Sequence, residues 1–174
     1  CSYAKNEWIV LMDSDNFADK TYFIVAKTYI ENNVLQKNTI LAPCFAKPRF
    51  NYSHLSGFIY KKGEFIKNNK LESKKLNAHF TSSETLMNTG NYVINKYLID
   101  NIDLTNETDN IKKSSACDVI YFNTLLFEQL NLELHVVPNL EYDHVVHDGS
   151  VYIQTHHKHA TFNNYVYNRY KQLH

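Results

Sequence analysis

Residues 7–20 read EWIVLMDSDNFADK, and this stretch decides the fold class. Residues 8–12 are apolar at every position, which predicts a short strand covered on both faces, as in a parallel or mixed sheet between helices; a buried piece of helix is the alternative. The run stops at Asp13 and Asp15, which are separated by one serine. Residues 18–31 then carry apolar side chains near helical spacing. A strand, an acidic turn and a helix in succession predict an α/β domain.

The rest of the chain continues this alternation of predicted strands and helices. The clearest helix is 117–130, because its apolar residues fall on one stripe. Asn16 and Asp19 are the two candidate caps of the first helix. The other predicted segments are strands at 39–44 (ending at Pro43), after the Gly90 turn within 88–96, and at 133–138 (ending at Pro138), a strand or loop at 54–60, an exposed Lys-rich helix face at 61–75, helices at 96–102 and 161–173, and a loop at 104–115.

Length and composition favour an ordinary globular domain. The 174 residues suit a single domain over 1–174. With 18 basic and 18 acidic residues, the net charge is zero and gives no electrostatic reason to expect a nucleic-acid partner. Three widely spaced cysteines form neither a disulfide framework nor a zinc motif, and no apolar run approaches the roughly 20 residues that span a bilayer. These features predict a cytoplasmic protein, and a chain that starts at Cys1 without Met is expected to be part of a longer one.

Asp13 and Asp15 are the first candidate ligands. Two carboxylates two residues apart on an extended turn point to the same side, and their repulsion is unfavourable unless a cation lies between them. Hard oxygen ligands select Mg²⁺ or Mn²⁺, whose open positions accept phosphate oxygens. The alternative is that these residues only form a turn and a helix cap. The chain has no Gly-rich phosphate loop, which argues against Rossmann and P-loop nucleotide sites.

Histidines form the second candidate group. Nine are present, and His144 and His147 lie in the stretch YDHVVHDGSVY. Because residues i and i+3 of a strand face opposite sides, we expect one of the two to meet a metal. His147 is the preferred ligand, since it precedes Asp148-Gly149-Ser150, where the chain can turn close to a ligand. The alternative for either histidine is a surface or hydrogen-bonded core residue.

Four stretches resemble, in this order, the GT-A-fold glycosyltransferases, nearest to the inverting family 2 group. They are EWIVLMDSDN, NTGNYVIN, ACDVIYFNTLL and YDHVVHDGSVY, and the resemblance covers about residues 4–160. In that family an Asp-x-Asp motif ends a central strand, a later acid begins a helix near the acceptor, and a late histidine completes the metal site. The resemblance implies a GT-A-like mixed sheet flanked by helices.

On the donor side, the resemblance assigns a role to each matching residue. Asp15 binds the metal directly, while Asp13 contacts the ribose or the metal through water. His147 is the late metal ligand. Gly90 and Asn91 line the pocket for the donor sugar. The implied cofactor is Mn²⁺ or Mg²⁺, and the implied donor is a UDP- or GDP-sugar.

On the acceptor side, Asp118 is implied as the general base. The family has an acidic pair at this helix start, whereas here Cys117 precedes Asp118 and leaves one carboxylate. The acceptor is a hydroxyl of a glycan, a protein or a lipid-linked molecule, and transfer proceeds with inversion. We also expect the loop 104–115 to close over the site, and Tyr92, Tyr121 or Tyr142 to stack on sugar rings.

The family's N-terminal half, which grips the nucleotide, has no counterpart in these residues. The resemblance therefore implies that this half lies upstream or in a partner chain, and that the sheet exposes an edge without it. Two other functions remain open at this point. One is a metal-dependent hydrolase of phosphoesters or glycans, with two metal ions. The other is a non-catalytic carbohydrate-binding or assembly module.

Overall fold

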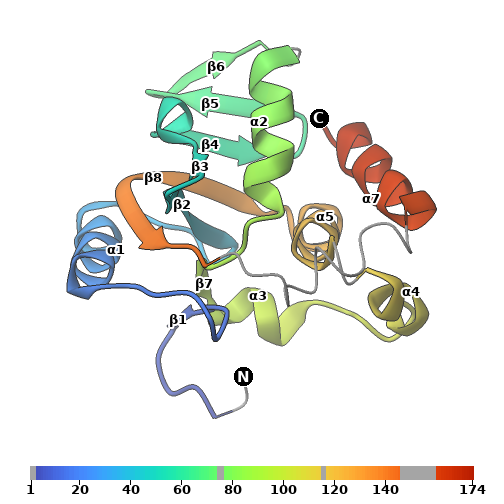
Figure 1. Cartoon of the computed structure of the whole chain (residues 1–174), viewed down its shortest axis with the longest axis horizontal. Coiled ribbons are helices and arrows are strands. Elements are labelled where there is room, and N and C mark those ends of the chain that lie inside the picture. The colour runs from blue at the N-terminus through green and yellow to red at the C-terminus, as the bar shows by residue number, and fades with distance from the viewer. Residues whose placement is uncertain (1–2, 74–76, 115–116, 146–159) are drawn as a thin grey trace.

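The computed structural model describes residues 3–73, 77–114, 117–145 and 160–174 (Figure 1). In chain order its elements are β1 (Trp8–Val10), α1 (Lys20–Asn32), β2 (Thr39–Lys47), β3 (Phe50–Asn51), the 3₁₀ turn η1 (Ser53–Leu55), β4 (Phe58–Lys61), β5 (Glu64–Lys67), β6 (Lys70–Glu72), α2 (Asn77–Met87), β7 (Val93–Asn95), α3 (Lys96–Asn101), α4 (Thr108–Lys113), α5 (Asp118–Leu130), β8 (Glu133–Asp143) and α7 (Ala160–Gln172).

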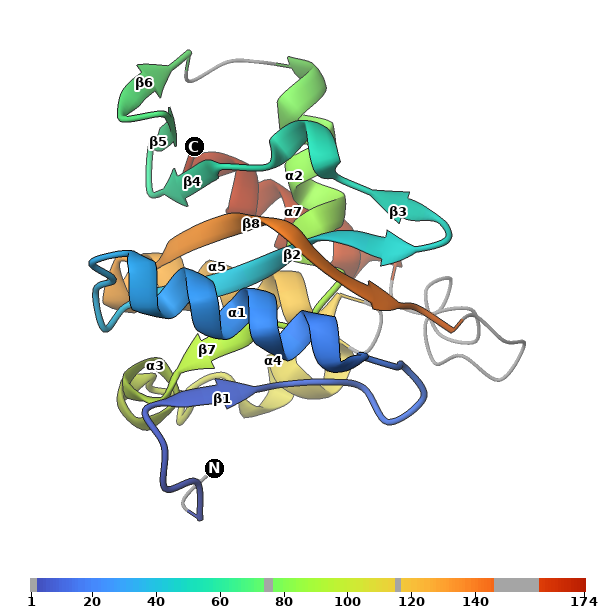
Figure 2. The same ribbon diagram turned by 90° about the vertical axis from the view of Figure 1, so that its left-hand side faces the viewer.

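The strands of the described residues form one mixed sheet. Its order is β1-β7-β2-β8-β4-β5-β6, and β3 pairs with β2 beside this path. The β2–β8 pair is parallel and the other pairs are antiparallel. Figure 2 shows α1 on one side of β2 and β8, with α5 and α7 on the other. The predicted α/β class, a mixed open sheet flanked by helices, is confirmed.

Strand β2 lies between two cores, as the apolar run 39–44 predicts. Ile40, Ala42 and Cys44 belong to the cluster under α5, whereas Leu41 and Ala46 belong to the cluster under α1. Side chains of a strand alternate between its faces, so a strand with helices on both sides must be apolar at every position. This is the sequence pattern that identifies the centre of the sheet.

Strand β1 is covered on both faces but lies at the edge of the sheet. Trp8 and Met12 pack against the cluster under α1, and Ile9 and Leu11 against the cluster under α5. Among the described strands β1 pairs only with β7, and Val10 is 38% exposed. The prediction of a strand buried on both faces is therefore wrong at Val10. An apolar run indicates that the faces of a strand are covered, but it does not indicate whether another strand pairs with each of its edges.

The first helix starts where one of its two candidate caps predicts. The Asp19 side chain accepts hydrogen bonds from Thr21 N at 2.8 Å and Tyr22 N at 3.2 Å, so Asp19 is the N-cap of α1. Tyr22 and Ala26 are the buried residues of the helix. Asn16 has a different role, described below.

The predicted helix at 117–130 is confirmed as α5, but it is more central than one apolar stripe indicates. Seven of its thirteen residues are buried, including Asn123 and Thr124. It ends at Asn131, whose left-handed φ of 49° suits a helix C-terminus. None of the helices within the described ranges is long and apolar enough to cross a bilayer.

Two polar segments were predicted wrongly. Residues 61–75 were expected to form an exposed helix face, but their described part contains β5 and β6. Asn68 and Asn69 turn the chain between these strands with φ of 51° and 61°, the conformation of a tight two-residue hairpin turn. Residues 104–115 were expected to be a loop, but they contain α4.

Both strands predicted to stop at a proline run through it. Strand β2 continues to Lys47 past Pro43, and β8 continues to Asp143 past Pro138. The parallel register shifts between Pro43 and Phe45, so the proline lies at a bulge. Proline is tolerated in a strand at a bulge, because the ladder there needs no N–H from it.

Candidate functional site

The acidic turn after β1 carries two exposed acidic residues, Asp13 and Asp15. Asn16 N donates to Asp13 O at 3.1 Å, and Asn16 Nδ2 donates to Asp13 Oδ2 at 3.1 Å. Asn16 therefore closes the turn rather than capping α1. The arrangement leaves two negative charges within one turn of the chain.

The segment before β7 lies directly against this turn. Gly90 and Asn91 both have left-handed backbone, with φ of 71° and 60°. Asp13 N donates to Asn91 Oδ1 at 2.9 Å, and Asn91 Nδ2 donates to Asp13 Oδ2 at 3.2 Å. The two segments are 78 residues apart in the sequence, so their contact is a property of the fold.

Asp118 is the first residue of α5 and lies close enough to the acidic turn for the charge of Asp13 to affect its pKa. Its Oδ1 accepts a hydrogen bond from Val119 N at 2.9 Å, and Cys117, not Asp118, is the N-cap. The residue as a whole keeps solvent-exposed surface, yet burial of its carboxyl group raises the pKa, and the charge of Asp13 adds to that shift. A Cβ on Gly90 would lie 3.3 Å from a methyl group of Val119, which places the Gly90 turn against the start of α5.

The end of β8 closes the other side of the acidic turn. Phe17 and Asp143 exchange backbone hydrogen bonds at 3.0 and 2.8 Å, and Val145 N donates to Asn16 Oδ1 at 3.0 Å. His144 lies between these contacts. Its pKa is lowered mainly by burial, while the charges of Asp13 and Asp15 oppose that shift. The imidazole is therefore favoured in its neutral form, in which one ring nitrogen can act as a ligand or acceptor.

His147, the preferred metal ligand of the sequence prediction, lies outside the described residues. The histidine that the structure places near Asp13 and Asp15 is His144. Both histidines were candidates in the sequence. His147 was preferred because the residues that follow it can turn the chain close to a ligand. Within the described residues, no three His, Cys, Asp or Glu side chains lie together as a ready-made metal cluster.

Tyr142 links the histidine to the amide of Asn91. Asn91 Nδ2 donates to the Tyr142 hydroxyl at 3.1 Å, and this hydroxyl lies 3.5 Å from His144 Nδ1, at the limit of a hydrogen bond. Tyr92, Tyr121 and Tyr142 are only 1–3% exposed. Burial leaves no open ring face at Tyr92 or Tyr121, against the expectation that they stack on a sugar ring, whereas Tyr142 lines the pocket described next and its stacking stays a prediction.

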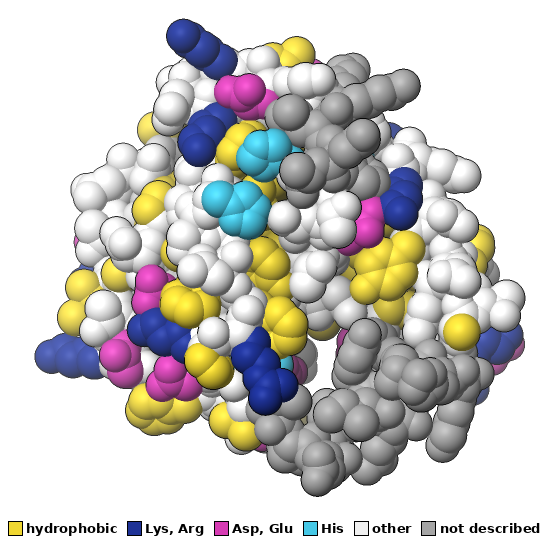
Figure 3. Space-filling model, turned by 45° about the horizontal axis from the view of Figure 1, so that its top comes forward, with side chains coloured by type: hydrophobic (Ala, Val, Ile, Leu, Met, Phe, Trp, Pro, Cys, Tyr) yellow, Lys and Arg dark blue, Asp and Glu magenta, His cyan; other side chains and the backbone are white. Residues whose placement is uncertain are grey.

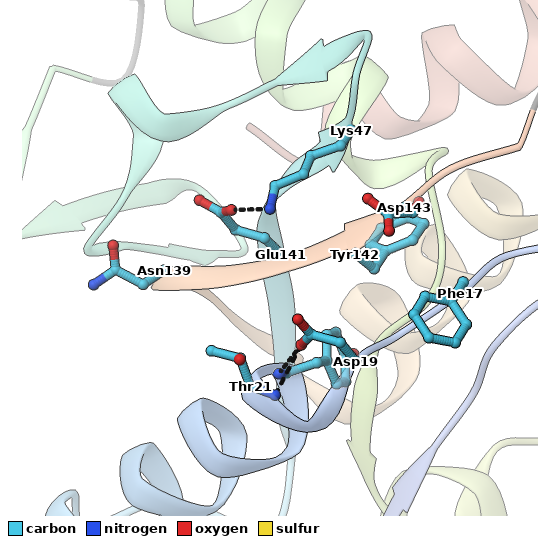
Figure 4. Close-up of a pocket in the computed structure, with 9 residues that line it drawn as sticks. Phe17, Asp19, Thr21, Lys47, Asn139, Glu141, Tyr142 and Asp143 are labelled. Carbon is cyan, nitrogen blue, oxygen red and sulfur yellow. Dashed lines mark hydrogen bonds and ion pairs between the residues drawn. The ribbon is translucent and has the colours of Figure 1, made fainter.

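A pocket of about 180 Å³ lies behind the acidic turn, between the start of α1 and the ends of β2 and β8 (Figure 4). Its walls include the Lys47–Glu141 ion pair, at 2.8 Å, and the Asp19 cap. It does not contain Asp13, Asp15 or Asp118, but Tyr22 and Tyr142 line it and also contact Asn91. Asn91, which is bonded to Asp13 and to both of these tyrosines, therefore connects the pocket lining to the acidic turn.

A separate pair of histidines lies on another face. His54 and His79 have ring centroids 6.1 Å apart, and His79 lies 5.2 Å from the Phe58 ring. Figure 3 shows two neighbouring histidine side chains over hydrophobic atoms, with basic and acidic side chains interspersed on that face. No acidic residue of the turn after β1 contributes to this pair, so we treat the acidic turn as the candidate site.

Comparison of the chain with family models, with curated proteins and with solved structures gave no match. The function of the chain must therefore be inferred from the geometry of the site itself. Of the predicted site residues that the structure describes, Asp13 and Asn91 are joined by hydrogen bonds, and Asp118 lies where the charge of Asp13 raises its pKa; Asp15 and Gly90 are chain neighbours of the bonded pair.

Proposed function

We propose that the chain is the metal-binding and acceptor part of a GT-A-like glycosyltransferase, which moves a sugar from a UDP- or GDP-sugar to an acceptor hydroxyl. One observation carries this proposal: hydrogen bonds join Asp13 to Asn91 and Asn91 to Tyr142. These bonds gather three of the four stretches on which the family resemblance depends. The fourth stretch contains Asp118, whose pKa is raised by the charge of Asp13 in addition to burial.

The donor set suits a hard divalent cation. Asp13 and Asp15 offer the carboxylate oxygens that Mn²⁺ and Mg²⁺ accept, and His144, which the described structure does not group with them, would have to move closer to add its imidazole. Carboxylates that lie close together repel each other, as the effect of Asp13 on Asp118 illustrates, so a cation between them is favourable. A Mn²⁺ or Mg²⁺ ion bound here would stabilise the charge that builds on the departing diphosphate. His147 stays a predicted additional ligand.

Asp118 is the proposed general base. Its raised pKa makes the carboxylate a better proton acceptor, and the amide groups at the start of α5 still favour its ionised form. In the proposed reaction the acceptor oxygen attacks the anomeric carbon while its proton passes to Asp118. The bond from that carbon to the diphosphate breaks, and attack from the opposite face inverts the configuration.

The proposal includes a nucleotide-binding half that continues the sheet at β1. Lys96 N donates to Glu7 O at 2.7 Å, and Leu11 N donates to Tyr92 O at 2.9 Å, so residues 7 and 11 face β7. In an antiparallel pair the alternate residues turn their N–H and C=O groups away, so the backbone groups of Trp8 and Val10 face the free edge. An added strand there would lie next to the acidic turn, where a nucleotide must bind.

Thermal denaturation with Mn²⁺ and a set of UDP- and GDP-sugars tests the proposal. A ligand at 100 times its Kd stabilises a protein by about 2.7 kcal/mol, which corresponds to a rise in Tm of roughly 5–10 °C for a chain of this size. We expect this rise only when Mn²⁺ and the nucleotide sugar are both present. Asp15→Asn should abolish it.

Asp109→Asn is the matched control, because Asp109 is an exposed acid on α4 whose nearest cation, Lys112, is 3.7 Å away. It should leave the shift unchanged. A wild-type chain that shows no Mn²⁺-dependent shift with any nucleotide sugar would refute the proposal. Release of sugar from a glycan without any nucleotide donor would favour the hydrolase instead.

A further inference from the structure

Asn91 is a buried polar residue in an uncommon backbone conformation. It is 3% exposed and has a φ of 60°. Asparagine tolerates left-handed backbone better than most residues, but glycine adopts it with less strain. The hydrogen bonds of its side chain explain why asparagine, rather than glycine, occupies this position.

The amide of Asn91 bonds to three other parts of the chain. Oδ1 accepts from Asp13 N, while Nδ2 lies 3.2 Å from Asp13 Oδ2, 3.3 Å from Thr89 O and 3.1 Å from the Tyr142 hydroxyl. Two of these neighbours, a carboxylate and a carbonyl oxygen, accept hydrogen bonds and never donate them. The NH₂ group must therefore face them, which fixes the orientation of the amide.

Asn91 is itself held in place from the opposite side. The Tyr22 hydroxyl donates to Asn91 O at 2.8 Å. Tyr22 and Tyr142 are 1% and 2% exposed, so both ends of Asn91 are anchored in the packed core under α1. The hydrogen bonds of Asn91 therefore join Asp13 to the packed core under α1.

Asp13 receives a defined orientation from these contacts. Its Oδ2 accepts from Asn91 Nδ2 and from Asn16 Nδ2, and its backbone N–H is bonded to Asn91 Oδ1. No hydrogen bond from a described residue reaches Oδ1. One carboxylate oxygen is bonded to the protein, and the other is left to meet a ligand from solvent.

We propose that Asn91 is a positioning residue for the cation site. It fixes the main chain and Oδ2 of Asp13, so that Oδ1 is presented to a divalent cation together with Asp15. This inference rests on the proposed function, because it gives Asn91 a role behind the metal rather than in contact with the sugar. Hydrogen-bond partners of metal ligands typically contribute 10- to 100-fold to metal affinity.

Asn91→Gly removes the amide and keeps the left-handed backbone without strain. We expect the Kd for Mn²⁺ alone, measured by titration calorimetry well below Tm, to rise by at least about tenfold. Asn68→Gly is the matched control, since Asn68 is also left-handed, with φ of 51°, but lies in the β5–β6 turn. It should leave the Kd unchanged.

Hydrogen exchange measured by NMR provides a readout that needs no metal. The Asp13 amide should lose its protection in Asn91→Gly, while the Leu11 amide, bonded to Tyr92 O, should keep it. Loss of Asp13 protection with an unchanged Mn²⁺ affinity would overturn the positioning role and leave the proposed function standing. A wild type that binds no Mn²⁺ would overturn both, and a protected Asp13 amide would then identify Asn91 as a structural cross-link.

Discussion

Replacing Tyr60 by Phe should raise the free energy of unfolding, because the buried hydroxyl of Tyr60 has no hydrogen-bond partner among the described residues. Tyr60 is 1% exposed on β4, with the Phe65 ring 4.8 Å away, and no described residue hydrogen-bonds its hydroxyl. Burial alone raises its pKa, with no hydrogen bond to offset the shift. An unpaired buried polar group costs about 1–3 kcal/mol. Removing it should stabilise the protein by about 1–2 kcal/mol and raise Tm by about 2–8 °C.

The same substitution at Tyr92 should have the opposite sign. The Tyr92 hydroxyl lies 3.2 Å from Leu86 O and 3.0 Å from Met87 O, and it accepts from Asn123 Nδ2 at 3.0 Å. In Tyr92→Phe, one N–H of the Asn123 amide keeps its bond to Met87 O at 2.9 Å. The other N–H, which donates to the Tyr92 hydroxyl, loses its acceptor. We expect Tyr92→Phe to destabilise the protein by about 1–2 kcal/mol.

Urea denaturation followed by fluorescence measures both variants against the wild type. The comparison controls for the chemistry, since each variant loses one hydroxyl from a buried tyrosine. We expect a higher urea midpoint for Tyr60→Phe and a lower one for Tyr92→Phe, with the same dependence of the free energy of unfolding on urea concentration in both. If Tyr60→Phe lowers the midpoint by as much as Tyr92→Phe, the Tyr60 hydroxyl has a partner, and the argument from its isolation fails.

Three further predictions address the site and its surroundings. Asp118→Asn should reduce sugar transfer by about 10²- to 10⁴-fold and leave donor affinity within twofold; loss of donor binding instead would place the base elsewhere. Gly90→Ala should cost about 1–2 kcal/mol in urea denaturation, because its φ is 71° and the new Cβ would lie 3.3 Å from Val119. Burial lowers the pKa of His174 to about 4, so the folded state binds its proton later than the unfolded state does. Stability should therefore fall, by up to about 3 kcal/mol, as the pH drops from about 6.5 toward 4, and His174→Phe should remove that part of the pH dependence.

The central elements were predictable because their sequence pattern reports directly on burial. Residues 39–44 are apolar at every position, and β2 lies between two cores there. Residues 117–130 repeat at helical spacing, and α5 spans almost the same residues. In both segments the local pattern and the tertiary environment agree, so no knowledge of distant contacts was needed.

Strands β5 and β6 were not predicted, because they are stabilised by contacts with other parts of the fold rather than by their own sequence pattern. Strand β5 is held by pairing with β4 and β6, and its one buried residue, Phe65, packs on Tyr60. Over residues 61–75 six lysines stand against three apolar residues, so periodicity gives little signal. The Asn68-Asn69 pair is the one local indication of a hairpin, because two adjacent asparagines suit the two left-handed positions of its turn.

The candidate site shows where sequence reasoning reaches its limit. Asp13, Asp118 and a late histidine could be selected by residue type and position, but the hydrogen bonds by which Asn91 joins Asp13 to Tyr142 could not be recognised. Asn91 acts through partners 69, 78 and 51 residues away, and each contact is set by strand order rather than by local sequence. A buried amide with an acceptor on each hydrogen is costly to disturb, because any substitution leaves a neighbour unpaired. The arrangement of Asp13 therefore depends on the contact that Asn91, just before β7, makes with Tyr142 near the end of β8, and variants in that contact should alter ligand affinity without touching the ligand.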